Sequence, residues 1–267
     1  MPFLRKWIYS GSVIEAEEYF AIRTPKSIKW CEIGNKPLRG KKRSFTSEEQ
    51  QKINNRNAVK HLWRLLNSNF QPNDIFVTND FREEPLRTNG EPDEEQVKKY
   101  IEKYTRKLRL IYKKAGIEFK YIWVIEKATE QGKIRIHFHM LLPKISLDAI
   151  ESCWSEGGCT LRRLDATRDY KGIANYLSKD PTLGMNHKKR WGQSKNLVQP
   201  KIDSRKIQYP GGPIKPPPGY KEIIDRSYWS DITGLIRYVR YVRMDGIDIA
   251  GRILQDAREA PDSINTE

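Results

Sequence analysis

One stretch of nine residues, 134–142, constrains the fold more than any other part of the chain. Its sequence, IRIHFHMLL, has an apolar side chain at every even position. Successive side chains of a β-strand point to opposite faces, so this alternation predicts a strand whose even face packs on a hydrophobic core. The odd face then carries His137 and His139, about 7 Å apart along the strand. Two imidazoles at this spacing can converge on one ion.

A carboxylate can be placed beside this histidine pair. The segment 119–126 is expected to form the preceding strand, with a turn centred on 131–132 between the two strands. A two-residue turn there fixes the register and, counted back along the hairpin, places Glu126 opposite His137. Opposed side chains lie about 5 Å apart. Glu126, His137 and His139 therefore predict a site for a divalent cation, with open positions for substrate oxygens. A solvated strand face is the alternative.

The elements around the hairpin indicate the fold class. Apolar periodicity and turn residues predict a series of strands and helices: strand 74–79, helix 93–115, strand 119–126, strand 134–142, helix 146–155 and strand 159–165. This β-α-β-β-α-β order is typical of a ferredoxin-like α+β fold, an antiparallel sheet with helices on one face. A helix over 46–68 is expected before this series, and another over 169–179 after it.

The chain is expected to divide into three parts. Residues 1–45 form a basic N-terminal extension, residues 46–200 form the domain with the histidine strand, and residues 201–267 combine a Pro-rich linker with a small accessory segment. The linker is the run PGGPIKPPPG at 210–219, which must be extended or turn-like.

The helix over 169–179 carries a second group of candidates. Tyr176 and Lys179 are three residues apart, so the ammonium can lie beside the phenol or beside a nearby phosphate. A phenol has an ordinary pKa near 10, and it becomes a nucleophile only with a cation or base close by. A helix-face aromatic residue beside a solvated lysine has the same spacing. Tyr170 is expected to face the core instead.

Net charge defines the class of partner. Lys and Arg number 49 against 34 Asp and Glu, which gives a formal net charge of +15. This excess favours a polyanion, either nucleic acid or an anionic membrane surface. No apolar stretch approaches the roughly 18 residues of a spanning helix, and the N-terminus lacks the apolar core of a signal peptide, so we expect no membrane insertion. Three cysteines without paired spacing suit a reducing, cytoplasmic environment.

Two segments, 187–191 and 237–243, mix cations with aromatic rings. Cations for phosphates and rings for stacked bases make a surface that binds single-stranded nucleic acid. A solvated basic edge strand is the alternative for the second segment. The candidate contacts are Lys188, Lys189, Arg190, Trp191, Arg237, Tyr238, Arg240 and Tyr241.

The motif His137-Phe138-His139, followed by Tyr176-Leu177-Ser178-Lys179, resembles the HUH endonucleases. This superfamily contains rolling-circle replication initiators (Rep proteins), relaxases and single-strand transposases. The segment 76–81, FVTNDF, is similar to the first motif of the initiators, although its Asn-Asp pair departs from that motif. The resemblance, which is to the bacterial plasmid and phage branch, covers about residues 54–200.

The resemblance implies a role for each candidate. His137, His139 and Glu126 would bind Mg²⁺ or Mn²⁺. Tyr176 would attack a phosphate of single-stranded or origin-hairpin DNA, leaving a 5′-phosphotyrosyl link and a free 3′-OH that primes replication. Lys179 would offset the developing charge. The chain has no Gly-x-x-x-x-Gly-Lys-Ser/Thr sequence, so a helicase, like the polymerase, is expected to come from the host.

Two alternative functions are open on the sequence. One is a transposase or relaxase of the same superfamily. The other is a non-catalytic module that binds single-stranded nucleic acid. Such a module accounts for the net charge, but it leaves the joint presence of the histidine pair, the carboxylate and the tyrosine-lysine pair unexplained.

Overall fold

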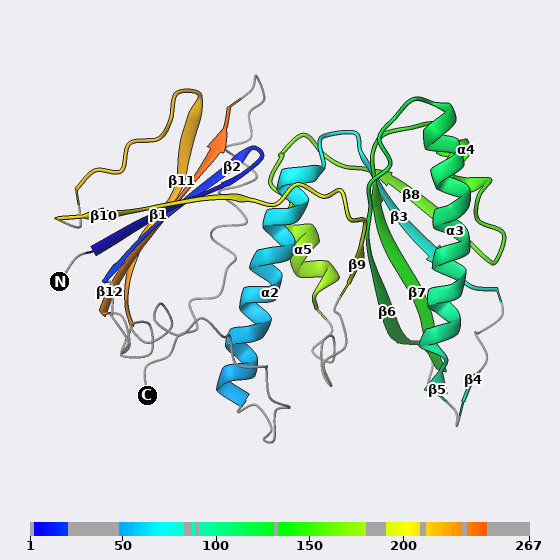
Figure 1. The fold of residues 1–267 in the computed structure, drawn as a ribbon. Coiled ribbons are helices and arrows are strands. Elements are labelled where there is room, and N and C mark those ends of the chain that lie inside the picture. Colours follow the sequence, from blue (N-terminus) through cyan, green and yellow to red (C-terminus); the bar gives the residue numbers. More distant parts are fainter. Residues whose placement is uncertain are drawn as a thin grey trace, which may run out of the picture. The chain divides into compact units, whose positions relative to one another are not determined.

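The computed structural model describes residues 3–20, 48–82, 87–88, 91–130, 133–179, 191–208, 212–230 and 234–244. Within these ranges the chain is α+β, with two antiparallel five-stranded sheets, a two-stranded ribbon and four helices (Figure 1). The chain divides into two compact units. The central unit comprises residues 65–199, and the terminal unit combines residues 1–64 with residues 200–267.

The sheet of the central unit has the strand order β8-β3-β7-β6-β9, and every neighbouring pair is antiparallel. Its strands are β3 (Ile75–Asp80), β6 (Ile122–Glu130), β7 (Lys133–Leu142), β8 (Cys159–Arg163) and β9 (Gly192–Gln193), and its helices are α3 (Glu94–Lys114), α4 (Leu147–Glu151) and α5 (Lys171–Leu177). A short ribbon, β4 (Arg87–Thr88) with β5 (Glu91–Pro92), lies between β3 and α3 in the chain. The predicted order β-α-β-β-α-β is confirmed, with β9 added at one edge.

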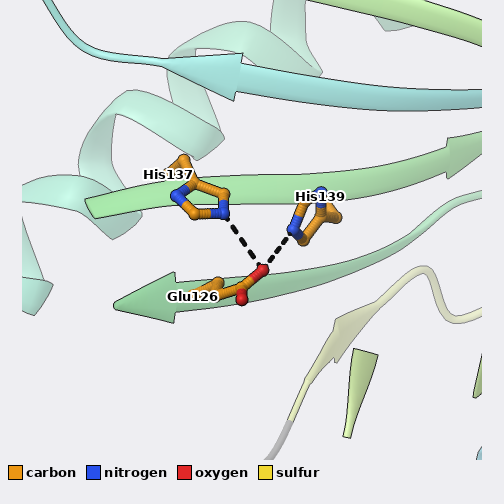
Figure 2. Close-up of side chains that lie close together, drawn as sticks. All are labelled: Glu126, His137 and His139. Atoms are coloured by element: carbon orange, nitrogen blue, oxygen red, sulfur yellow. Dashed lines mark hydrogen bonds and ion pairs between the residues drawn. The ribbon is translucent and has the colours of Figure 1, made fainter. Parts of the chain in front are cut away.

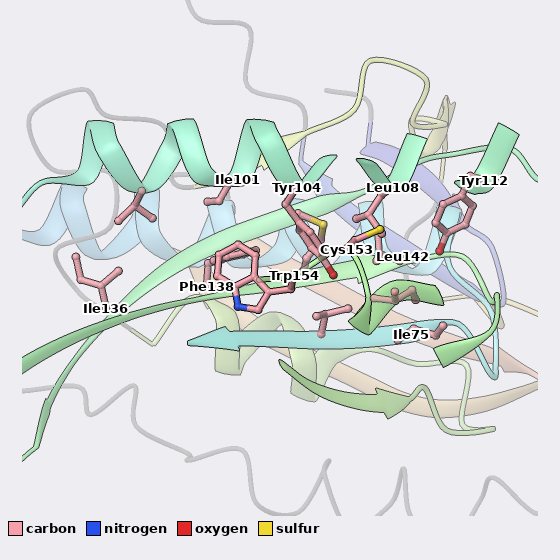
Figure 3. Packing of buried hydrophobic residues seen from close by; sticks show 14 residues of the cluster. Ile75, Ile101, Tyr104, Leu108, Tyr112, Ile136, Phe138, Leu142, Cys153 and Trp154 are labelled. Atoms are coloured by element: carbon pink, nitrogen blue, oxygen red, sulfur yellow. The ribbon is translucent and has the colours of Figure 1, made fainter. Parts of the chain in front are cut away.

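One face of this sheet is buried under α3 and α4 (Figure 3). The apolar stripe predicted on α3 is confirmed, since Val97, Ile101, Tyr104 and Leu108 are all buried. They pack in one cluster with the even positions of β7 and with Trp154, which follows α4. Because the core takes up the even face of β7, the odd face with its histidines belongs to the other side of the sheet.

The terminal unit contains the second sheet, in the order β10-β1-β2-β12-β11. Its strands are β1 (Phe3–Ser10), β2 (Val13–Phe20), β10 (Lys201–Ile207), β11 (Tyr220–Ser230) and β12 (Gly234–Arg243). The sequence predicts a separate N-terminal extension and a separate C-terminal segment, whereas in the structure β2 pairs with β12 over the span from Tyr19 to Val13. The two ends of the chain thus share one sheet and one core, a pairing that no local pattern can show.

The helix α2 (Glu48–Asn69) runs from the terminal unit into the central unit along the chain. Its last turns bury Leu62, Leu65 and Leu66, as expected from their spacing. Ile53, expected on the same buried side, is instead 40% exposed. The turn at 131–132 lies outside the described residues. In the part of the chain that the structure describes, no helix is both long and apolar enough to cross a membrane.

Candidate metal centre and tyrosine site

The hairpin β6-β7 sets the positions of the three candidate ligands. Glu126 pairs with His137 and Glu130 pairs with Lys133, so the predicted register is confirmed. On its other side β7 pairs with β3, which places Thr78 opposite His139. Directly paired residues lie on the same face of a sheet. The odd face of β7 therefore meets a carboxylate on one side and a hydroxyl on the other.

The three ligand atoms converge on one point (Figure 2). The Oε2 atom of Glu126 lies 3.0 Å from Nε2 of His137 and 2.6 Å from Nε2 of His139. One ligand atom from each residue lies within 4.8 Å of the others. Two imidazole nitrogens and one carboxylate oxygen are a donor set that first-row divalent cations accept. The residues therefore fit a divalent cation, and they leave further coordination positions for oxygen atoms of a substrate.

His139 is held in one orientation by its neighbours. It is only 2% exposed, its Nδ1 lies 3.0 Å from Oγ1 of Thr78, and its ring stacks on Phe76 at 5.3 Å. The contact at Nδ1 leaves Nε2 facing Glu126. Burial lowers the pKa of His139 and outweighs the opposing hydrogen bond with Glu126. At neutral pH the imidazole is therefore uncharged, which is the form that binds a metal ion.

Glu126 remains ionised because three donors surround it. Burial acts to raise the pKa of this carboxyl, but hydrogen bonds from Lys179, His139 and His137 hold the pKa at about 2. Nζ of Lys179 lies 2.5 Å from Oε1 of Glu126, the oxygen that does not face the histidines. The carboxylate thus links the histidine pair to the lysine.

The helix α5 brings Tyr176 to the same place. Its ring centroid lies 5.2 Å from that of His139 and 6.4 Å from that of Phe76, and the residue is 43% exposed. Lys179, two residues after the end of α5, has its Nζ 4.4 Å from the centroid of the Tyr176 ring. Burial and the charge of Glu126 raise the pKa of Tyr176, against the charge of Lys179. All five predicted residues of this site are therefore neighbours.

Sequence reasoning missed the supporting residues of the site. Phe76 and Thr78 contact His139, and both lie at alternate positions of β3, on the face opposite the buried Ile75 and Val77. The period-2 pattern of this strand was available as a signal. Pairing of β3 with β7, however, joins segments far apart in the sequence and could not be read from it.

The second basic-aromatic segment proves to be structural. Arg240 is 1% exposed with its guanidinium 5.6 Å from the centroid of the Trp63 ring, and Tyr241 is fully buried. The Tyr238 hydroxyl donates to Glu15, and Arg237 donates to both oxygens of the Asp225 carboxylate. This corrects the expectation of a single-strand surface for Arg240 and Tyr241, because β12 is an interior strand whose neighbours are β2 and β11.

The first basic-aromatic segment lies mostly outside the described residues, which exclude Lys188, Lys189 and Arg190. Trp191 is described, and its Nε1 donates to Gln193 at 2.7 Å. A nucleic-acid role for these four residues stays a prediction.

Comparison with known proteins identifies the segment that carries this site. Residues 74–181 match the family described as Replication-associated protein ORF2/G2P. The matched segment begins just before β3 and ends just after Lys179, so it contains the two histidines, Glu126 and Tyr176. No curated protein and no solved structure matches the chain.

Proposed function

We propose that this chain starts rolling-circle replication by nicking one DNA strand, because residues 74–181 match the family described as Replication-associated protein ORF2/G2P. In this proposal the central unit is an HUH endonuclease with a ferredoxin-like palm. The strand order β8-β3-β7-β6, the interleaved β-α-β-β-α-β connections and the helices α3 and α4 on one face support that assignment.

The convergence of Tyr176 with the histidine pair is the observation that carries the proposal. An exposed phenol beside a candidate metal centre is the arrangement that nucleophilic attack on phosphorus requires. A non-catalytic binding module would not need Tyr176, Lys179 and Glu126 to meet at the histidines. Their meeting therefore favours catalysis over simple binding.

The chemistry is a transesterification. Oη of Tyr176 attacks the scissile phosphorus, the bond from phosphorus to O3′ breaks, and the departing oxygen gains a proton and becomes a free 3′-OH. The phosphate stays on the tyrosine as a 5′-phosphotyrosyl ester, so the reaction can be reversed without a further energy source. In-line attack needs the phosphate held close to the phenol, which is what the exposed position of Tyr176 beside the ligand set permits.

The residues around Tyr176 have different roles in this proposed reaction. His137, His139 and Glu126 would hold Mg²⁺ or Mn²⁺, which when bound would polarise the scissile phosphate. Lys179 lies close enough to the Tyr176 ring to stabilise the negative charge that develops on its oxygen. Because the pKa of Tyr176 is raised, the phenol is protonated at neutral pH and must lose its proton during the attack. Thr78 keeps His139 in the orientation that presents Nε2.

A covalent-trapping experiment tests the proposal. The native protein, with Mn²⁺ and a mixed-sequence pool of single-stranded DNA labelled at the 3′ end, should become labelled and stay so in a denaturing gel. DNA labelled at the 5′ end should instead be released. Tyr176→Phe removes one oxygen and should abolish the adduct, whereas Tyr228→Phe, at a similarly exposed tyrosine of the terminal unit, should not. Lys179→Ala should slow the formation of the adduct without abolishing it.

The alternatives give different results in the same experiment. An adduct on a tyrosine other than Tyr176 would keep the enzyme class and overturn the assignment of the nucleophile. Binding without any adduct, with metal and single-stranded DNA both present, would identify a non-catalytic nucleic-acid-binding module. A transposase or relaxase would also form the adduct, and the family match to replication-associated proteins is what favours an initiator.

A further inference from the structure

A cavity of about 720 Å³ lies directly beside Tyr176 in the central unit. Its walls come from β3, β7, β8 and α5, and the histidine pair lies at one side. The volume is within the range of sites that bind small ligands, roughly 300–1,000 Å³. The attack of Tyr176 needs room only for the scissile phosphate, so the cavity offers space for a further part of the substrate.

Arg162 projects into this cavity because of its register in the sheet. It pairs with Phe76, and Thr160 pairs with Thr78, so both residues of β8 share the face that carries the histidines. The neighbouring Arg163 pairs with Ile75 on the face of the core, and its guanidinium donates to the carbonyl of Asn73 at 3.4 Å. Although both arginines border the cavity, the register turns the side chain of Arg162 toward the site.

The guanidinium of Arg162 is available for a ligand. The residue is exposed, and no carboxylate among the described residues forms an ion pair with it. Asp165 also lines the cavity, but its carboxylate accepts hydrogen bonds from the backbone and the hydroxyl of Thr167. Apolar side chains of Leu164 and Ile173 complete this part of the wall. A cation above apolar surface suits the phosphate and the base of one nucleotide.

We propose that this cavity is a subsite for a nucleotide close to the scissile phosphate, and that Arg162 binds the phosphate of that nucleotide. The inference rests on the proposed function, because the scissile phosphate defines the starting point. Arg162 is a positioning residue, and the residue that attacks is Tyr176.

The geometry of the sheet separates the two phosphates. Strand β8 is two strands from β7, which is about 10 Å at the usual spacing. Stacked nucleotides advance about 3.4 Å along one strand. In this proposal the phosphate bound by Arg162 lies within about three stacked nucleotides of the phosphate at the histidines and is a different group. Fixing a nearby phosphate limits the rotation of the strand and aligns the scissile bond for in-line attack.

The test measures phosphate contacts without requiring cleavage. The full chain is titrated with a fluorescent oligothymidylate of about 16 nucleotides in chelator, at several salt concentrations from about 50 to 300 mM. Arg162→Ala should bind about three- to tenfold more weakly at the lower salt. The slope of log affinity against log salt should fall in magnitude by about 0.7, the value for one lost phosphate of a single strand. Arg162→Lys should keep the slope.

Matched variants separate a local contact from a general effect of charge. Arg106→Ala removes an exposed arginine from α3, which covers the opposite face of the sheet, and should leave affinity and slope unchanged. Arg162 is exposed on an edge strand, and Arg162→Gln replaces the Ala variant if circular dichroism shows that the latter does not fold. In the nicking assay Arg162→Ala should raise KM and also lower kcat, because the scissile bond is then less well aligned, whereas Arg106→Ala should change neither.

The proposal would be overturned if Arg162→Ala had the affinity and the salt slope of the native chain. It would also be overturned if Arg106→Ala lost as much affinity as Arg162→Ala, or if the native chain did not bind the oligothymidylate. Its failure can be told from that of the proposed function. If Arg162→Ala keeps the native salt slope while the native chain forms the tyrosine adduct, only the subsite is refuted. If the salt slope of Arg162→Ala falls as expected but the native chain forms no adduct, the nicking reaction is refuted and the cavity remains a nucleotide-binding site.

Discussion

Replacing Glu126 with glutamine should show how strongly the site favours a negative charge. The change keeps the shape of the side chain and removes its charge. Burial acts to raise the pKa of this carboxyl, but Lys179, His139 and His137 hold it at about 2 against an ordinary value of 4.5. The difference corresponds to roughly 3.4 kcal/mol in favour of the folded protein. Lys179 is 53% exposed, and solvent screens its contribution, so we expect about 2 kcal/mol.

The sign of the effect sets its pH dependence. The pKa of Glu126 is lower in the folded protein than in the unfolded chain, so the stabilisation is complete above pH 4.5 and is lost as the pH falls toward 2. For a single titrating group with these two pKa values, less than half of the stabilising free energy remains at about pH 3. The advantage of the native protein over Glu126→Gln should therefore shrink to about 1 kcal/mol there.

Hydrogen exchange followed by mass spectrometry measures this difference in the strands that carry the site. In metal-free buffer, amides of β6 and β7 should exchange about 30-fold faster in Glu126→Gln than in the native protein at pH 7, and about fivefold faster near pH 3. Glu102→Gln, at an exposed position of α3, is the matched control and should exchange like the native protein. Equal rates at pH 7, or an undiminished difference near pH 3, would show that the charge of Glu126 does not stabilise these strands.

Three further predictions concern the same unit. Thr78→Val should weaken Mn²⁺ binding in calorimetry by about tenfold or more, because it removes the hydroxyl that contacts Nδ1 of His139. Thr160→Val, on the adjacent strand, is the control and should leave the Mn²⁺ affinity unchanged. Equal Mn²⁺ affinities in both variants would contradict the role of Thr78. Mn²⁺ affinity should be constant at neutral pH and fall only below pH 6.5, because burial lowers the pKa of His139 from that value; a fall between about pH 8 and 7 would contradict it. Gly157→Ala should lower the free energy of unfolding by about 1–3 kcal/mol, since a Cβ there would lie 2.0 Å from the carbonyl oxygen of Asp80. Gly172→Ala, with nothing within 4 Å, is its control in thermal unfolding, and equal stabilities of the two variants would show that the chain relaxes at no cost.

Features that depend on near neighbours could be predicted from the amino-acid sequence alone. The alternation over 134–142 assigned one face of β7 to the core and the other to the histidines, because side chains of a strand alternate strictly. A two-residue turn fixes the register of a hairpin, so the position of Glu126 opposite His137 followed from counting. The stripe on α3 followed in the same way from the helical period.

The contacts between distant segments, in contrast, became visible only in the folded chain. The fold placed Thr78 and Phe76 against His139, and it turned Arg162 toward the cavity through the pairing of β8 with β3. It also buried Arg240, whose alternating pattern resembled an exposed basic edge, because β12 pairs with a strand from the other end of the chain. Periodicity shows that a face is apolar or charged, but the partner that covers the face comes from non-local pairing. For the same reason Tyr176 became part of a site only when α5 packed beside the histidine strand.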